Sequence, residues 1–462
     1  MTEPGRITGR NRLIRNGRLA ANRRARRLCI EALEAALAAV DPARSVASKL
    51  RLARGRILVD GISVKISARI VAISVGKASV PMLTAALRIL GRHVESAILV
   101  APKTEKISGL DRRIIPFRTG HPIPDGEGIK ASRHVIESIT HMHRDDLLLC
   151  LISGGASAML PAPANNISLD DKKRITERLI RSRASIHEVN TVRRHLSELK
   201  GGGLVKLCEA GHVISLIVSD VPGNTLPDIA SGLTAPDPTT FQDAIHVLKE
   251  FDAWTEAPAN VRKRLMQGST GKIPDTPKPG DDIFRKVHNF IIADNRSACE
   301  AMKKTLDRMS TPTTVLTSSL NMEARSLGRL LASIAKDSES LNRPLKRPSA
   351  IVLGGETTVD VKGHGMGGRN QEVALAALNG IGGLRGVGIA TLGTDGIDGH
   401  SPAAGAILDG QSMARASRIG LQLRKYMAEN DSFNLFRRLG DNIITGRTGT
   451  NVCDVCVLVR TK

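Results

Sequence analysis

Residues 351–372 read IVLGGETTVDVKGHGMGGRNQE, and the interpretation of the whole chain begins from this stretch. It opens as an apolar run that breaks at Gly354 and Gly355, and then alternates between apolar and polar residues as far as position 361. These patterns predict two short strands separated by glycines. A glycine-rich loop follows, and the apolar spacing of residues 373–378 predicts a helix directly behind it.

The junction between this loop and the predicted helix concentrates polar side chains. Gly368, Arg369, Asn370 and Glu372 stand at the expected helix start, and Glu356 follows the first strand. Exposed N–H groups and the helix dipole favour an anion at such a position. An arginine there can clamp a phosphate or carboxylate with two parallel hydrogen bonds. A simple glycine-rich hairpin followed by a capped helix remains an alternative for this segment taken alone.

The same arrangement recurs along the chain, which makes the simple alternative weaker. Five apolar runs end in loops of small and charged residues: SVGKAS (74–79), LISGGAS (151–157), IVSDVPGN (217–224), VLGGET (352–357) and TLGTDGIDG (391–399). Such runs are typical of buried parallel strands covered by helices, so an α/β fold is predicted. Ligands of open parallel α/β sheets bind outside the carboxyl ends of the strands.

The side chains in these loops suit phosphoryl transfer to a small acid. Lys77 and Arg369 can neutralise charge on a transferring phosphoryl group. Asp220 and Asp395, with Asp398 as a further acid, can hold Mg²⁺, although aspartates also serve as turn formers and helix caps. The residues expected to bind substrate or phosphate are Ser153, Gly154, Gly155, Ser157, Asn190, Arg193, Lys200, Ser219, Gly354, Gly355, Glu356, Gly368, Asn370, Glu372 and Thr394. Asn190, Arg193 and Lys200 lie outside these loops at spacings that allow one helix face, and a solvated helix face is the alternative for these three.

Composition limits the other classes of function. A length of 462 residues favours two domains, and an aromatic content of 2% argues against a stacking platform for single-stranded nucleic acid. The net charge of +22 is concentrated in part among nine arginines within the first 27 residues, interpreted as a solvated basic extension with no specific nucleic-acid partner. We expect no membrane span and no secretory signal. Six scattered cysteines fit a reducing cytoplasm.

Longer motifs occur in one order along nearly the whole chain. They include VGKAS (75–79), GHPIPD (120–125), SGGASAMLPAP (153–163), NTVRRHLSELKGGGL (190–204), IASGLTAPDPTT (229–240), GMGGRNQE (365–372) and TGTNVCD (448–454). With these motifs the chain resembles the glycerate 2-kinase family, whose C-terminal part is called the MOFRL domain. The resemblance implies ATP- and Mg²⁺-dependent phosphorylation of D-glycerate to 2-phosphoglycerate. The family's important lysine falls on Lys77 and its important arginine on Arg369.

The resemblance also implies two Rossmann-like, three-layer α/β domains with mostly parallel sheets and an active site in the cleft between them. The expected parts are a basic extension (1–25), an N-terminal glycerate kinase-type domain (26–260), a connecting α/β segment (261–345) and a C-terminal MOFRL-type domain (346–462). Three positions depart from the family pattern: Asn224 replaces an acid, Leu233 replaces a proline, and Arg447 interrupts a motif.

Two other classes of function stay open. Members of the family have often been labelled hydroxypyruvate reductases, and Gly363, Gly365 and Gly368 match the dinucleotide pattern G-x-G-x-x-G. No acid lies about 20 residues beyond these glycines, which counts against a reductase that uses NAD(P)H. The basic charge also allows a non-enzymatic binding protein. The sequence does not decide whether the protein forms a homodimer.

Overall fold

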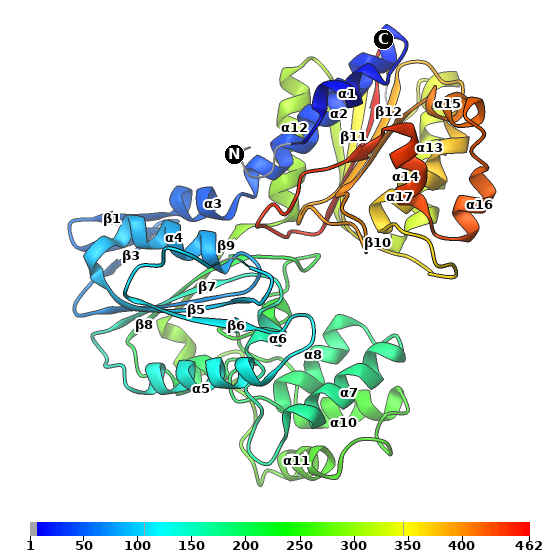
Figure 1. Cartoon of the computed structure of the whole chain (residues 1–462). Coiled ribbons are helices and arrows are strands. Elements are labelled where there is room, and N and C mark those ends of the chain that lie inside the picture. The colour runs from blue at the N-terminus through cyan, green and yellow to red at the C-terminus, as the bar shows by residue number, and fades with distance from the viewer. Residues whose placement is uncertain (1–6, 106, 345) are drawn as a thin grey trace. The chain divides into compact units, whose positions relative to one another are not determined.

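The computed structural model describes residues 7–105, 107–344 and 346–462, and the chain divides into two compact units (Figure 1). Unit 1 comprises Met1–Asp41 and Ala293–Lys462, and unit 2 comprises Pro42–Ile292. These boundaries differ from the expected ones. The segment 261–345, expected to connect two domains, is divided between the units, and residues 7–41 belong with the C-terminal part of the chain.

Unit 2 is built around a six-stranded sheet with the order β6-β5-β4-β7-β8-β9. The strands are β4 (Ile70–Val75), β5 (Val94–Pro102), β6 (Ile114–Thr119), β7 (Leu147–Ile152), β8 (His212–Val218) and β9 (Val287–Ala293). The pairings from β6 through β8 are all parallel. Every residue of β4 and β7 is buried, as expected for parallel strands covered on both faces. The expected parallel α/β architecture is therefore confirmed for this unit.

Helices cover both faces of the unit 2 sheet (Figure 1). The helix α4 (Ser79–Leu90) lies on one face and α5 (Gly126–Thr140) on the other. The remaining elements are α3 (Pro42–Lys49), α6 (Ala156–Met159), α9 (Gly203–Leu207), the antiparallel strands β1 (Leu50–Ala53), β2 (Arg56–Val59) and β3 (Ile62–Lys65), and the 3₁₀ turns Gly91–His93, Ile229–Ser231 and Asp282–Lys286. Asp125 accepts a hydrogen bond from Gly128 N at 3.0 Å, which caps α5 at its first turn.

Four further helices of unit 2 form a separate group with its own apolar core. They are α7 (Leu169–Arg181), α8 (Ile186–His195), α10 (Phe241–Glu250) and α11 (Ala259–Ser269). Capping boxes start α7 at Ser168, α8 at Ser185 and α10 at Thr240, and each satisfies two backbone groups. We call these four helices the helical group.

Unit 1 contains a second six-stranded sheet, with the order β10-β11-β15-β12-β13-β14. Its strands are β10 (Thr313–Glu323), β11 (Ser349–Thr358), β12 (Val387–Gly393), β13 (Gly405–Asp409), β14 (Asn442–Ile443) and β15 (Asp454–Arg460). Only β10 and β11 pair in parallel, whereas the other pairings are antiparallel. The expectation of a mostly parallel sheet is wrong here, because β15 runs between β11 and β12 in the opposite direction.

The strand β11 also differs from the expected pair of short strands. It continues through Gly354 and Gly355 to Thr358, and residues 359–361 form no strand. A side chain at Gly354 would collide with Asn295, and one at Gly355 would collide with the backbone of Leu320. The two glycines thus allow neighbouring segments to approach the strand closely, rather than ending it.

Helices lie on both faces of the unit 1 sheet (Figure 1). The helices α1 (Arg10–Arg15), α2 (Ala20–Ala39) and α12 (Asn295–Arg308) lie on one face, and α13 (Ala324–Ser340), α14 (Arg369–Gly380), α15 (Ser412–Arg418), α16 (Leu423–Ala428) and α17 (Ser432–Leu439) lie on the other. Among the described residues, no helix has the length and apolar character that crossing a membrane requires.

The basic N-terminal segment is not a solvated extension from residue 7 onward. Arg26 is fully buried in α2, where it pairs with the buried carboxylates of Asp409 and Asp441, the latter at 2.9 Å. Its Nη1 also donates to Leu13 O at 3.0 Å, which ties α1 to α2. The arginine-rich helices are therefore an integral layer of unit 1, and residues 1–6 lie outside the described residues.

Candidate active site

Three adjacent strands of unit 2 carry predicted site residues at their carboxyl ends. Lys77 follows β4, Ser153 follows β7, and Asp220 follows β8, and these strands are neighbours in the sheet. Lys77 N donates to Gly154 O at 2.9 Å, and Ala78 N donates to Ser153 Oγ at 3.0 Å. The parallel sheet therefore brings the loops after β4 and β7 into direct contact.

Glycines make this close approach possible. A side chain at Gly76, whose φ is +118°, would collide with Ser153, and one at Gly154 would collide with the carboxylate of Asp220. A Cβ at Gly155 would lie 2.7 Å from His121 Cδ2. Burial, with the charge of Lys77 as a second cause, lowers the pKa of His121 to about 4, so that its imidazole is neutral at pH 7. His121 thus lies beside the glycine loop of this site, although it was not among the site residues predicted from the sequence.

The predicted residues of α8 divide into structural and cavity-lining ones. Asn190 Oδ1 accepts from Ser231 Oγ at 2.9 Å, and its Nδ2 donates to Asp228 O at 3.2 Å. The hydroxyl of Ser231 also bonds that of Ser157. Asn190 therefore holds the loop at Ser231 in place, which in turn positions Ser157 beside the glycine loop after β7.

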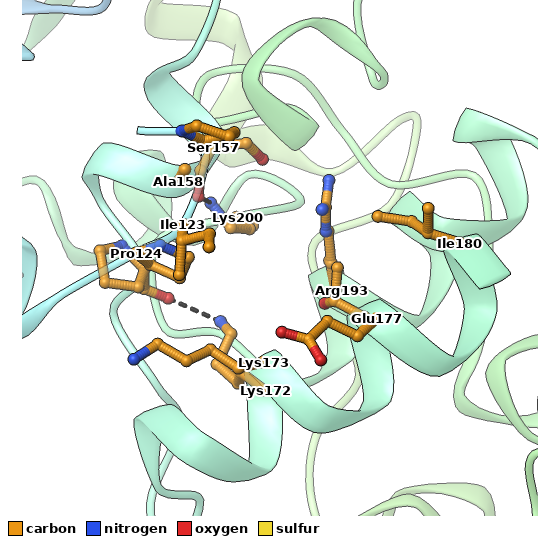
Figure 2. Close-up of a pocket in the computed structure, with 13 residues that line it drawn as sticks. Ile123, Pro124, Ser157, Ala158, Lys172, Lys173, Glu177, Ile180, Arg193 and Lys200 are labelled. Carbon is orange, nitrogen blue, oxygen red and sulfur yellow. Dashed lines mark hydrogen bonds between the residues drawn. The ribbon is translucent and has the colours of Figure 1, made fainter. Parts of the chain in front are cut away.

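Arg193 and Lys200 line a cavity of about 210 Å³ next to the helical group (Figure 2). Lys200 Nζ donates to Ser157 O at 2.8 Å and to Leu160 O at 3.1 Å. The cavity is also lined by Lys172, a buried lysine of α7 that sequence reasoning did not select. Its position in a polar helix offered no signal that its side chain turns inward.

Unit 1 brings its predicted residues to the start of β15. Gly355, within β11, and Gly393, at the end of β12, both lie opposite Asp454, the first residue of β15. Arg369, at the start of α14, pairs with Asp454 through Nε at 2.6 Å and also pairs with Glu356. The carboxylates of Asp454 and Glu356 thus hold the guanidinium of Arg369 where β11, β12 and β15 lie side by side.

Asp454 is a site residue that the sequence-based set missed. Its Oδ1 accepts from Arg369 Nη2 at 3.1 Å and from Asn370 Nδ2 at 2.9 Å. Burial raises the pKa of Asp454 to about 6 against the lowering effect of Arg369. The available signal was an acid opening an apolar strand in the motif TGTNVCD, which is an unusual place for a buried charge.

Other predicted residues of unit 1 support this geometry. Asp398, considered as a metal ligand, instead caps α14 by accepting from Asn370 N at 3.0 Å and Gln371 N at 2.8 Å. A side chain at Gly368 would collide with Asp398, which explains the glycine. Glu372 accepts from Arg325 Nε at 2.7 Å, and Thr394 Oγ1 donates to Cys453 O at 2.6 Å. Asp398, Glu372 and Thr394 therefore fix the helix and the loops around Arg369.

Comparisons with known proteins were consistent over the whole chain. Residues 28–266 match a family described as a domain of unknown function (DUF4147), and residues 349–454 match the MOFRL family. Glycerate 2-kinase from Pyrococcus horikoshii is 37% identical, with 92% of this chain and 95% of that protein covered. D-glycerate 2-kinase from Thermotoga maritima is 36% identical, with 94% and 97% covered. The chain belongs to the glycerate 2-kinase family.

Further relatives extend the comparison. The crystal structure of a glycerate kinase from Thermotoga maritima has a TM-score of 0.83 at 35% identity, covering 94% of this chain and 99% of that one. A protein from Agrobacterium vitis that carries a hydroxypyruvate reductase name is 35% identical, with 93% of each chain covered. The reductase label therefore occurs within the glycerate 2-kinase family and does not define a separate one.

Departures from the glycerate 2-kinase pattern fall on ordinary structural positions. Asn224 has a φ of +59°, a conformation that asparagine tolerates better than most residues. Leu233 is buried in the apolar core of unit 2. Arg447 is exposed in the loop before β15. None of these three positions disrupts the contacts described around Lys77 or Arg369.

The two aspartates predicted to hold Mg²⁺ belong to different units of the chain. In the part of the chain that the structure describes, no group of three or more His, Cys, Asp or Glu side chains could hold a metal ion. Asp220 lies against Gly154 in the loop after β7, and Asp395 Oδ1 accepts from Ile397 N at 3.2 Å. Mg²⁺ commonly takes one or two carboxylates together with substrate phosphates, so these donors fit an ion that arrives with a nucleotide.

Proposed function

We propose that the protein is a glycerate 2-kinase, which transfers the terminal phosphoryl group of ATP to the 2-hydroxyl group of D-glycerate. The match to two glycerate 2-kinases over more than nine-tenths of the chain carries this proposal. None of the six cysteines forms a disulfide in the described structure, and all are buried, which supports a cytoplasmic location.

The residues fit the demands of phosphoryl transfer. Charge spreads over the phosphoryl oxygens in the transition state, so catalysis depends on cations and N–H donors that are already in position. Lys77 supplies a cation beside the glycine loop after β7, and Arg369 supplies a guanidinium whose orientation Asp454 and Glu356 fix. In this proposal both cations stabilise phosphoryl charge and orient the acceptor acid.

The other residues of the site have supporting roles. Asp220 and Asp395 are the carboxylates that would hold Mg²⁺, and the ion would supply positive charge that offsets the charge of the phosphate groups. The amides of Gly154 and Gly155 and the hydroxyl of Ser153 are suited to phosphate oxygens, because a glycine loop at a strand end lets backbone N–H groups approach an anion.

A reductase that uses NAD(P)H is the second candidate, favoured only by the name of the Agrobacterium vitis relative. The glycines that suggested a dinucleotide loop have another explanation. Side chains at Gly363, Gly365 and Gly368 would collide with Glu429, Asp431 and Asp398, respectively. These glycines allow the loop to pack against neighbouring segments, and β11 ends at Thr358 instead of leading directly into the first glycine as a dinucleotide fold requires.

Steady-state kinetics of variants tests the proposed roles. Arg369→Ala and Lys77→Ala should each lower kcat for D-glycerate by at least about a hundredfold, since each removes a cation from the transition state. Lys362→Ala is the matched control, because its exposed ammonium pairs with Asp360 at 3.2 Å in the same unit as Arg369. Near-normal turnover of either active-site variant would remove that residue from the mechanism.

A further inference from the structure

The cavity beside the helical group has an unusual lining of charge. It is enclosed by the loop at Pro122–Pro124, by α6, by α7 and by α8 (Figure 2). Lys172 and Lys200 lie on one side with Ile123 and Pro124, and Arg193 lies on the other side with Glu177 and Ile180 (Figure 2). The cavity volume of about 210 Å³ is sufficient for a small organic molecule.

Two buried lysines and one partly exposed arginine of this lining have no carboxylate partner among the described residues. Lys172 is 6% exposed and Lys200 is 2% exposed, and within the described residues neither they nor Arg193 forms an ion pair. Lys172 Nζ donates to Pro161 O at 2.6 Å, and Lys200 bonds two carbonyl oxygens. The guanidinium of Arg193 makes no hydrogen bond in the part of the chain that is described.

The three cations also affect one another. Burial lowers the pKa of Lys172, with further lowering by the charges of Lys200 and Arg193. Burial and the charge of Arg193 lower the pKa of Lys200 to about 7. Burial alone lowers the pKa of Arg193 to about 10. Without a counterion in the cavity, burial thus disfavours the charged forms of these groups, and a bound anion would favour them.

The fully buried arginines Arg194 and Arg26 differ from Arg193, because their charges are paired with carboxylates. Arg194, the next residue of α8, pairs with Asp237 at 3.0 Å and with Asp228 at 3.4 Å. Arg26 in unit 1 pairs with Asp441 at 2.9 Å. Because buried charges are normally paired, the two buried lysines beside the partly buried Arg193, without a carboxylate partner in the described chain, indicate a place for an anion that comes from outside the chain.

The location of the cavity links it to the proposed phosphoryl-transfer residues. Ser157, which lines the cavity, follows the glycine loop that bonds Lys77 N. Pro122, another lining residue, follows His121, and a Cβ at Gly155 would lie 2.9 Å from His121 Nε2. The apolar side chains of Ile123 and Ile180 suit a carbon skeleton next to the charged group.

We propose that this cavity binds the carboxylate of the acceptor acid. Arg193 donates a bidentate pair of hydrogen bonds to that carboxylate, and Lys172 and Lys200 provide further positive charge around it. A planar guanidinium matches a carboxylate geometrically. The assignment of the acid as the acceptor rests on the proposed kinase function, whereas the binding of a carboxylate does not.

Calorimetric titration of the purified full chain with D-glycerate, without nucleotide, tests the cavity directly. Arg193→Met should weaken binding by about tenfold to a hundredfold, the range expected for a lost charge-assisted hydrogen bond. Arg193→Lys should recover part of the affinity, because lysine keeps the positive charge but cannot donate two parallel hydrogen bonds to a carboxylate. Arg181→Met is the control: its exposed side chain on α7 lies 3.9 Å from Glu177, a residue of the cavity lining.

Two further readouts separate binding from folding. The melting temperature of Arg193→Met without ligand should be unchanged or higher, since the variant removes a partly buried charge that has no carboxylate partner among the described residues. If that variant does not fold, Arg193→Gln provides the same comparison. Glycerol, which lacks the carboxylate, should not bind detectably.

The outcomes distinguish this inference from the kinase proposal. Unchanged D-glycerate affinity and KM in Arg193→Met, with active wild-type protein, would overturn the cavity assignment and leave the kinase intact. Arg193-dependent binding of D-glycerate without any phosphorylation would support the carboxylate site and overturn the kinase. Binding of inorganic phosphate but not of D-glycerate, lost in Arg193→Met, would overturn the acceptor assignment.

Discussion

The substitution Arg26→Met tests whether the arginine-rich N-terminal helices are part of unit 1. Arg26 is fully buried and bonds Asp409, Asp441 and, at 3.0 Å, Ser412 Oγ. Methionine keeps an unbranched apolar stem but removes the charge and all of these donors. The variant therefore leaves two fully buried carboxylates without their shared cation.

The magnitude follows from what remains around each carboxylate. Asp441 keeps the cation of Arg415 and accepts from Asn16 Nδ2 at 2.9 Å. Asp409 keeps only neutral donors, Asn22 Nδ2 at 3.2 Å and the Gln411 N–H at 2.7 Å. Removing one partner of a buried ion pair costs about 3–5 kcal/mol. For a domain of this size, about 2–4 °C per kcal/mol gives a fall in Tm of about 6–20 °C.

Thermal unfolding followed by far-UV circular dichroism measures this change. Arg27→Met, an exposed arginine one residue along the same helix, should change stability by less than about 0.5 kcal/mol. Arg26→Met combined with Asp409→Asn should recover about half of the loss, because the unpaired charge is then removed. Equal melting temperatures for Arg26→Met and Arg27→Met would refute this reasoning. That result would indicate that the arginine-rich N-terminal segment does not pack against the rest of unit 1.

Three further predictions concern the site. Asp454→Asn should lower kcat/KM by about tenfold at pH 7, because the substitution weakens the contact that orients the guanidinium of Arg369. The wild-type activity should fall as the pH drops through about 6, where the buried Asp454 takes up a proton, and this fall should be absent in the variant. A variant that still loses activity through pH 6 would contradict this role of Asp454. Affinity for D-glycerate should fall as pH rises through about 7, where buried Lys200 loses its proton, and Lys200→Met should flatten that dependence. Gly154→Ala should lower turnover by at least about tenfold because its Cβ would collide with Asp220, and an unaffected rate would show that the loop is tolerant.

The strands of unit 2 could be predicted from sequence because their burial leaves a plain pattern. Residues 147–152 are apolar throughout, and the observed β7 has the same bounds. The direction of β15 could not be predicted, since a run such as 454–460 has the same composition whichever way it runs in a sheet. The burial of Arg26 likewise depends on Asp409 and Asp441, which are distant in the sequence.

The site shows the same division. Lys77 and Ser153 were predicted together because parallel strands place their carboxyl ends at one edge of the sheet. Asp454 was not predicted as a site residue, because it stands at the amino end of β15 and the prediction considered only the carboxyl ends of strands. Since β15 is antiparallel to β11 and β12, its amino end lies beside their carboxyl-terminal parts. Lys172 was missed because a lysine in a polar helix is normally solvated, and only the packing of α7 and α8 turns it inward.

The regiochemistry of phosphorylation tests the central claim most directly. Purified protein would be incubated with ATP, Mg²⁺ and D-glycerate, and the product supplied to enolase with or without phosphoglycerate mutase. The account predicts a product that enolase consumes without the mutase, because phosphorylation occurs at the 2-hydroxyl group. A product that requires the mutase would place the phosphoryl group at the 3-position, and oxidation of NADH with hydroxypyruvate in the absence of ATP turnover would assign the protein to the reductases.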